Sequence, residues 1–343
     1  MASKEDAYKR FAQKSRNKFN LDALSKAILD GDLASLSHAI TLAESTLQQH
    51  HQNLSELLET LLPHTGKSIR VGITGVPGVG KSTFIESFGL QLCKAGHKVA
   101  VLAIDPSSSR TRGSILGDKT RMEELSREKK AFIRPSPSSG ALGGVANATR
   151  ETILLCEAAG FDVILVETVG VGQSEVLVRE MVDFFLLLML AGAGDELQGI
   201  KRGIMEMADL LIINKVDGDN VQKAKRAKAE YQNALHLFPL AASKWSPKVK
   251  LCSALQNEGL DAVWKEVLTF QEFTRENGFW DLQRKRQQSH WFHATLTEQL
   301  KHSFYSNPEV KSQIFDLEKA IAENKSDPYH AAQDLIKHWL KKS

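Results

Sequence analysis

Residues 75–82 read Gly-Val-Pro-Gly-Val-Gly-Lys-Ser, which matches the G-x-x-x-x-G-K-[ST] pattern of a phosphate-binding loop. An apolar, β-branched run over 69–74 precedes the loop and a helical pattern over 82–95 follows it, as this motif requires. Glycines without Cβ atoms let backbone N–H groups surround phosphate oxygens, and a helix N-terminus favours an anion. We predict that Lys81 neutralises the β- and γ-phosphates and that the Ser82 hydroxyl holds Mg²⁺. The predicted nucleotide loop comprises Gly75, Val76, Pro77, Gly78, Val79, Gly80, Lys81, Ser82 and Thr83.

A second motif, N-K-x-D, begins at Asn214, directly after another apolar run. The Asp217 carboxylate can accept hydrogen bonds from guanine N1–H and from the exocyclic amine, and adenine offers neither donor there. Asn214 would support the loop and the base edge, and the Lys215 stem can lie over the ring. After a further strand candidate, guanine O6 can receive a backbone N–H from the segment Ser253, Ala254 and Leu255. Together the two motifs predict a guanine nucleotide site.

An acidic residue follows a third apolar run, over 163–166, at Glu167. At the end of a strand beside the phosphate loop, Glu167 would lie near Mg²⁺, directly or through a water. Gly170 is placed to donate its N–H to the γ-phosphate. Loss of that phosphate would then release the segment that follows Gly170.

Two more carboxylates belong to the same prediction. Asp105 ends the strand candidate over 98–104 and could orient or deprotonate the attacking water. Asp118 could reach the metal shell in a closed state. An arginine could cover γ-phosphate charge, although solvated loop charge is the favoured interpretation for each of Arg110, Arg112 and Arg121.

Strands and helices alternate from 66 to 275, which predicts a doubly wound, mainly parallel α/β sheet as the core of a P-loop GTPase domain. The strand candidates are 69–74, 98–104, 162–167, 184–190, 209–213 and 249–252. Helical patterns fall at 82–95, 145–159, 198–207, 220–237 and 259–275. Residues 106–144 are rich in Ser, Gly and Pro and predict a long functional loop.

Helical extensions are predicted on both sides of this core, over 1–65 and 276–343. In the first, the stretch Asp30-Gly31-Asp32 is a credible helix cap, and apolar side chains share one face at Leu33, Leu36, Ile40 and Leu47. In the second, helices are expected to join around Pro308 and to resume after Pro328. Two interpretations would explain the apolar faces of this second extension. Its helices either pack on the core domain or form a surface for a dimer or another partner.

Composition narrows the function classes. The 343 residues carry a net charge of +3, too small and too scattered to indicate a nucleic-acid or membrane partner. Three separated cysteines, Cys93, Cys156 and Cys252, predict buried thiols rather than a disulfide set or a zinc site. The N-terminus lacks an apolar signal core, and we therefore expect a cytoplasmic location.

Longer stretches resemble the ArgK/MeaB/MMAA family of P-loop GTPases. They read D-P-S-S-S and G-S-I-L-G-D-K-T-R-M within 98–144, E-T-V-G-V-G-Q-S-E over 167–175, and G-D-E-L-Q-G-I-K-R-G over 194–203. Members of this family are G-protein chaperones of adenosylcobalamin-dependent methylmalonyl-CoA mutase. One departure is the Thr-Arg-Gly at 111–113, where the family usually has Thr-Gly-Gly or Ser-Gly-Gly.

The resemblance implies phosphate, Mg²⁺ and catalytic roles for Lys81, Ser82, Asp105, Asp118 and Glu167. It also implies a homodimer formed through the C-terminal helices, and mobile segments that couple nucleotide state to the mutase. The residues expected to take part in that coupling are Gln173, Asp195, Glu196, Gln198 and Lys201.

We therefore predict a Mg²⁺-dependent GTPase that converts GTP to GDP and phosphate and gates cofactor loading or protection of the mutase. The alternative is an accessory ATPase or kinase of an amino-acid (lysine/arginine/ornithine) transport system, which the guanine-selective N-K-x-D motif disfavours. A metal-insertion GTPase is a third hypothesis, but it should show paired Cys or His ligands. The tandem pair His50-His51 is the one feature of that kind, and helical neighbours point in different directions.

Overall fold

The computed structural model describes residues 20–45, 47–104, 122–135, 142–168, 174–192 and 202–342. The chain forms two compact units, Met1–Lys285 and Arg286–Ser343, and each is described by itself. Within the described residues, no helix is both long and apolar enough to span a bilayer.

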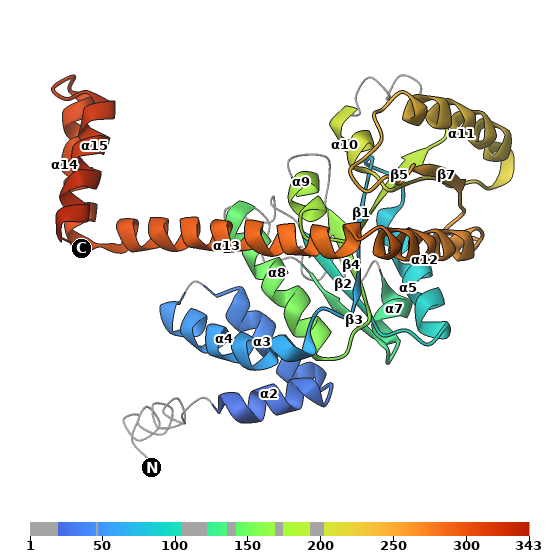
Figure 1. Ribbon diagram of the computed structural model, residues 1–343, viewed down its shortest axis with the longest axis horizontal. Helices are drawn as coiled ribbons and strands as arrows, with labels where there is room; N and C mark the ends of the chain where they lie inside the picture. The colour runs from blue at the N-terminus through green and yellow to red at the C-terminus, as the bar shows by residue number, and fades with distance from the viewer. Residues whose placement is uncertain are drawn as a thin grey trace, which may run out of the picture. The chain divides into compact units, whose positions relative to one another are not determined.

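A seven-stranded sheet forms the centre of the first unit (Figure 1). Its strand order is β3-β2-β4-β1-β5-β6-β7, and every neighbouring pair is parallel. The strands are β1 (Ile69–Gly75), β2 (Val99–Ile104), β3 (Ala131–Arg134), β4 (Val163–Thr168), β5 (Phe184–Leu190), β6 (Leu210–Asn214) and β7 (Lys248–Leu251). The strands β2, β4 and β6 are buried throughout, as expected for a parallel sheet covered on both faces.

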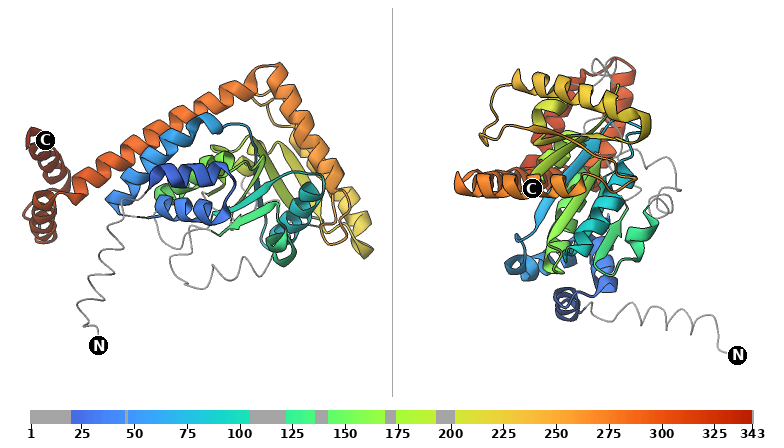
Figure 2. Two further views of the ribbon diagram at one scale, coloured as in Figure 1. Left: turned by 90° about the horizontal axis from the view of Figure 1, so that it is seen from below. Right: turned by 90° about the vertical axis from the view of Figure 1, so that its right-hand side faces the viewer.

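Helices cover the two faces of the sheet and build two hydrophobic cores (Figure 2). One core contains side chains of α5 (Lys81–Lys94), α7 (Glu123–Arg127), α10 (Arg202–Met207), α11 (Val221–His236) and α12 (Leu260–Glu276). The other contains side chains of α2 (Leu21–Leu29), α3 (Leu33–Ala43), α4 (Gln48–Leu61), α8 (Leu142–Ala158) and α9 (Ser174–Arg179). In β2 and β4 the side chains alternate between these two cores, because successive Cβ atoms of a strand point to opposite faces of the sheet.

The helix α3 begins directly after the predicted cap Asp30-Gly31-Asp32. Asp32 Oδ2 accepts a hydrogen bond from Ser35 N at 2.8 Å, and Leu36 and Ile40 are fully buried. The expected face was wrong in two positions, because Leu33 and Leu47 are 41% and 58% exposed. Leu33 is the first residue of α3, and Leu47 lies outside that helix as the N-cap of α4, so neither follows the buried stripe.

The region predicted as one long loop contains regular structure. Between 106 and 144 the structure has the short helix α7 and the edge strand β3. The prediction of an uninterrupted loop was therefore wrong. Both elements are too short to show a clear period in the sequence, and β3 is stabilised by pairing with β2 and by burial of Ala131 and Phe132.

The six predicted strands are present, with ends shifted by at most one residue. The six-residue helix α9 was not predicted, and α8 begins at Leu142, three residues earlier than expected. Within the described part of the chain the three cysteines are buried and free, as predicted. Burial raises the pKa of Cys93 to about 11 and that of Cys252 to about 12, so both thiols stay protonated.

Buried charges hold the residues after α12 against the amino-terminal ends of β1 and β5. Arg284 donates Nε to Asp183 Oδ1 at 2.8 Å and Nη2 to Asp183 Oδ2 at 2.7 Å. Arg70 donates Nε to Glu157 Oε1 at 2.9 Å, and Glu157 also accepts the Ser68 hydroxyl. Both carboxylates have almost no exposed surface, and both are fully hydrogen-bonded, as buried ions must be.

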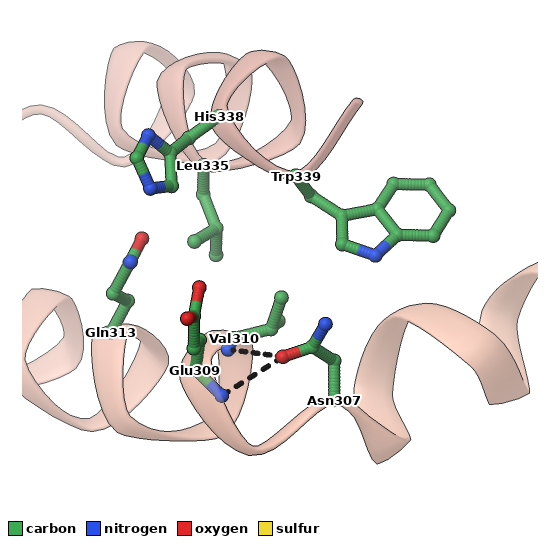
Figure 3. Close-up of a pocket in the computed structure, with 7 residues that line it drawn as sticks. All are labelled: Asn307, Glu309, Val310, Gln313, Leu335, His338 and Trp339. Atoms are coloured by element: carbon green, nitrogen blue, oxygen red, sulfur yellow. Dashed lines mark hydrogen bonds between the residues drawn. The ribbon is translucent and has the colours of Figure 1, made fainter. Parts of the chain in front are cut away.

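The second unit contains the continuation of α13 (Phe279–Ser306), followed by α14 (Pro308–Ala322) and α15 (Pro328–Lys342). The expected breaks at Pro308 and Pro328 are confirmed. Figure 3 shows a small pocket between α14 and α15, in which Asn307 Oδ1 accepts hydrogen bonds from the N–H groups of Glu309 and Val310. Val310 and Leu335 are buried between these two helices.

Candidate nucleotide site

The loop after β1 has the backbone that phosphate binding requires. A Cβ atom on Gly75 would lie 2.5 Å from Leu188 O, so only glycine fits where β1 passes β5. Gly78 and Gly80 have φ angles of +74° and +86°, in the left-handed region that glycine favours. Gly80 is the N-cap of α5 and has no side chain with which to cap the first N–H groups of the helix.

Lys81 starts α5 and folds back over the loop. Its Nζ donates a hydrogen bond to Gly75 O at 3.0 Å. Burial lowers the pKa of Lys81, while the negative charges of Glu167 and Glu175 act in the opposite direction. This cation therefore lies among the loop carbonyls and two carboxylates, where a phosphate oxygen could replace the Gly75 carbonyl as its hydrogen-bond acceptor.

Asn214 joins the phosphate loop to the base-recognition segments. It is the last residue of β6 and is 1% exposed. Its Nδ2 donates to Val79 O at 2.9 Å, and its Oδ1 accepts the N–H of Ala254 at 3.2 Å. A single buried amide thus links three segments that are far apart in the sequence.

Lys215 and Asp217 lie beside this link. Lys215 has a φ of +59°, and its Nζ donates to Gly78 O at 2.8 Å. The stem of Lys215 therefore lies across the loop, where the sequence predicts the purine ring. Asp217 is half-buried, and its Oδ2 accepts the hydroxyl of Ser253 at 2.7 Å, which fixes the orientation of the carboxylate.

The metal prediction rests on hard oxygen ligands at one edge of the sheet. Ser82 lies in the first turn of α5, and Glu167, 6% exposed, lies near the end of β4. Because β4 pairs with β1 and Ile73 is opposite Glu167, this carboxylate is close to the start of the phosphate loop. A hydroxyl and a carboxylate suit Mg²⁺. In the described ranges no group of three or more His, Cys, Asp or Glu side chains could hold a metal by itself.

Eight predicted site residues lie outside the described residues, and their roles remain predictions. They are Asp105, Asp118, Gly170, Gln173, Asp195, Glu196, Gln198 and Lys201. The same holds for the three loop arginines, Arg110, Arg112 and Arg121. The described residues of the prediction come together around the carboxyl ends of β1, β4 and β6 and the turn after β7.

Two features near the phosphate loop were not predicted from the sequence. Thr168 donates its hydroxyl to Thr74 Oγ1 at 2.8 Å, which joins the ends of β4 and β1. Glu175 is fully buried on α9 and contributes to the electrostatics of Lys81. Glu175 closes the E-T-V-G-V-G-Q-S-E stretch, and an acidic residue next to a valine-rich helical segment was the signal that could have indicated its role.

Three features together define the P-loop GTPase class: the parallel sheet, the glycine loop that leads into α5, and the N-K-x-D segment that is hydrogen-bonded to this loop. The family model of the methylmalonyl Co-A mutase-associated GTPase MeaB matches residues 36–309. The chain belongs to this family, and it is a GTP-hydrolysing enzyme.

Three comparisons illustrate the similarity. GTPase ArgK of Escherichia coli is 45% identical over 319 residues, which cover 93% of this chain and 96% of the relative. The methylmalonic aciduria type A homolog, mitochondrial, of Mus musculus is 46% identical over 329 residues, covering 92% and 79%. A crystal structure of an LAO/AO transport system kinase superposes with a TM-score of 0.73 at 37% identity, covering 94% of this chain and 99% of that one.

Proposed function

We propose that the protein is a Mg²⁺-dependent GTPase in which the phosphate loop and the guanine-reading segments form one site. The observation that carries this proposal is the Asn214 amide, which bonds to Val79 O in the phosphate loop and to the Ala254 N–H beside Asp217. Through this link, the position of a bound base would be fixed relative to the triphosphate. Such fixed geometry is how phosphoryl-transfer enzymes lower the barrier.

In the proposed reaction, water attacks the γ-phosphorus, the bond to the bridging β–γ oxygen breaks, and GDP leaves. Lys81 and the N–H groups of the loop neutralise charge on the β- and γ-phosphates. Ser82 and Glu167, with Asp105 and Asp118, would hold Mg²⁺, which supplies positive charge beside the leaving group. Asp105 would orient the water, and Gly170 would contact the γ-phosphate. The remaining residues of the phosphate loop would contribute their backbone N–H groups to the same phosphates.

We further propose that the GTPase is a chaperone of an adenosylcobalamin-dependent methylmalonyl-CoA mutase. The name of the family model and that of the mouse relative support this assignment. Nucleotide state would reach the partner through Gln173 and through the segment that contains Asp195, Glu196, Gln198 and Lys201. A homodimer through the helices after 276 belongs to the same proposal, as do the boundaries 1–65, 66–275 and 276–343.

A transport-system role is the second candidate because the superposed crystal structure is titled a transport system kinase. That reading needs ATP as phosphoryl donor. The carboxylate of Asp217 stands against it, since adenine would leave this acceptor without a donor. GTP hydrolysis is therefore the better-supported function.

The experiment that tests the proposal uses the purified protein and a purified adenosylcobalamin-dependent mutase. We expect GTP to compete for the site far better than ATP, and the mutase to bind and change the GTPase rate. A preference for ATP would favour the transport role instead. Guanine preference without any effect of the mutase would remove the chaperone role and leave the GTPase assignment.

A further inference from the structure

A hydroxyl on the phosphate-binding helix reaches the segment that is expected to read the base. Ser87 lies on α5, about one and a half turns after Ser82. Its Oγ donates to the carbonyl oxygen of Ala254 at 2.8 Å, across 167 positions of sequence. The sequence reasoning gave Ser87 no role.

This bond completes the fixation of the Ala254 backbone. The N–H of Ala254 is held by Asn214 Oδ1 at 3.2 Å, and its C=O is held by Ser87. In a planar trans peptide the C=O and the next N–H point in opposite directions. Holding the Ala254 carbonyl towards α5 therefore also sets the direction of the Leu255 N–H, away from that helix.

One longer bond also reaches this peptide, because the N–H of Asn257 donates to the Ala254 oxygen at 3.4 Å. The Leu255 side chain is 77% exposed and does not anchor its own backbone by packing. The turn is closed further along by Ser253 and Glu258, which exchange two backbone hydrogen bonds of 3.0 Å. These bonds close the ends of the turn, and the Ser87 hydroxyl, at 2.8 Å, makes the shorter of the two hydrogen bonds to the carbonyl of the peptide between Ala254 and Leu255.

We propose that Ser87 is a positioning residue for base recognition, which acts by holding the 254–255 backbone so that an N–H faces the oxygen at purine position 6. This inference rests on the proposed guanine site. Ser87 does not touch the nucleotide in this account. It connects the helix that binds the phosphates to the turn that reads the base.

The chemistry of purines separates this role from that of Asp217. Asp217, held by Ser253, would read N1–H and the 2-amino group. The backbone at 254–255 would read the position-6 oxygen. Hypoxanthine keeps that oxygen and N1–H but lacks the 2-amino group, and adenine lacks the oxygen. The affinities for GDP, IDP and ADP therefore report separately on Asp217 and on the 254–255 backbone.

The test measures dissociation constants of GDP, IDP and ADP for the full-length protein by competition against a fluorescent GDP. Ser87→Ala should weaken GDP and IDP by the same factor, roughly threefold to tenfold, and leave ADP unchanged. The GDP-to-IDP ratio then stays at its wild-type value, while discrimination against ADP falls. In GTP hydrolysis, KM should rise and kcat should change little.

Three further variants control for packing. Ser87→Thr keeps the hydroxyl and Ser87→Val has the same shape without it, so only the threonine variant should bind GDP and IDP like the wild type. Gln91→Ala removes a side chain one turn further along the same face of α5, where it bonds to Asp261 of α12. This variant should leave all three affinities unchanged.

Several results would overturn the role of Ser87. These are equal weakening of all three nucleotides, no change in any of them, or equal behaviour of the threonine and valine variants. Failure of the guanine site itself looks different, because wild-type protein would then bind ADP as well as GDP.

Discussion

Two cations in the site bond to carbonyl oxygens of the phosphate loop. Lys81 donates to Gly75 O and Lys215 donates to Gly78 O. Their surroundings differ, because Lys81 is half-buried with two carboxylates nearby and Lys215 is exposed. A charged group that has already lost part of its hydration binds phosphate with a smaller further desolvation cost. Lys81 is therefore expected to contribute most to triphosphate binding.

Replacing this cation gives the first prediction. Lys81→Ala should lower the affinity for GTP and GDP by about 3 kcal/mol, roughly 100-fold, because charge-assisted hydrogen bonds to phosphate are lost. Isothermal titration calorimetry would measure the loss. Lys223→Ala, on the exposed face of α11, is the control and should bind GTP normally. Unaltered GTP affinity in the Lys81 variant would contradict the phosphate-cradle assignment.

The second prediction concerns base choice. Asp217→Asn should shift preference from guanine to xanthine nucleotides, because the new amide can donate to the added carbonyl of xanthine. Competition between GDP and XDP measures the shift. Ser253 keeps a partner in this variant, since an asparagine oxygen still accepts its hydroxyl. Guanine selectivity equal to that of the wild type would refute the assigned role of Asp217.

At the scale of elements, α9 connects the phosphate site to the sheet. A Cβ atom added at Gly72 of β1 would lie 2.8 Å from Phe185, 2.9 Å from Val178 and 2.9 Å from Val182. The missing side chain is what allows α9 to approach the strand that ends in the phosphate loop. One turn before Val178 on the same helix lies the buried Glu175.

Filling that space gives the third prediction. Gly72→Ala should destabilise the protein by about 1–3 kcal/mol, because α9 must shift to accommodate the methyl group. Gly203→Ala should not destabilise it, because outside the backbone of α10 itself the described residues place no atom within 4 Å of the added Cβ. Urea unfolding of both variants measures the difference. Equal stability of the two variants would mean that α9 is not docked as described.

The fourth prediction tests the buried ion pair between β5 and the start of α13. Asp183→Asn should lower the free energy of unfolding by about 3 kcal/mol, because it leaves Arg284 buried beside a neutral group. The comparison is Asp334→Asn, whose exposed pair with Lys337 is 3.6 Å long and should contribute well under 1 kcal/mol. Unfolding curves in urea that move equally for both variants would contradict this account.

Long, strongly patterned elements could be predicted from the sequence, and short ones could not. The strand β5 and the first four residues of β6 are continuous apolar runs, and β1 leads directly into the fixed motif of the phosphate loop, so these three strands were located to within one residue. The elements β3 and α7 have four and five residues and depend on neighbours distant in sequence. Asn214 was predicted to support the loop. Its two hydrogen-bond partners and the Ser87–Ala254 hydrogen bond could not be predicted from the sequence, because they join segments that only the fold brings together.

At the scale of the whole molecule, the proposed function links one enzymatic site to a partner protein. The sheet brings together segments at 75–82, 167–168, 214–217 and 253–255 from four of its strands. Family membership assigns GTP hydrolysis to this arrangement. The chaperone role requires that a change at the γ-phosphate reach surfaces that a mutase can bind, which is a two-state property of the assembly.

A crystal structure with Mg²⁺ and a non-hydrolysable GTP analogue would test directly whether the phosphate loop and the base-recognition segments form one site. We predict phosphates within hydrogen-bond distance of Lys81 and of the N–H groups at 78–83, with the guanine edge on Asp217. A purine bound elsewhere, or a nucleotide that leaves either of these two places empty, would contradict the claim that they form one site.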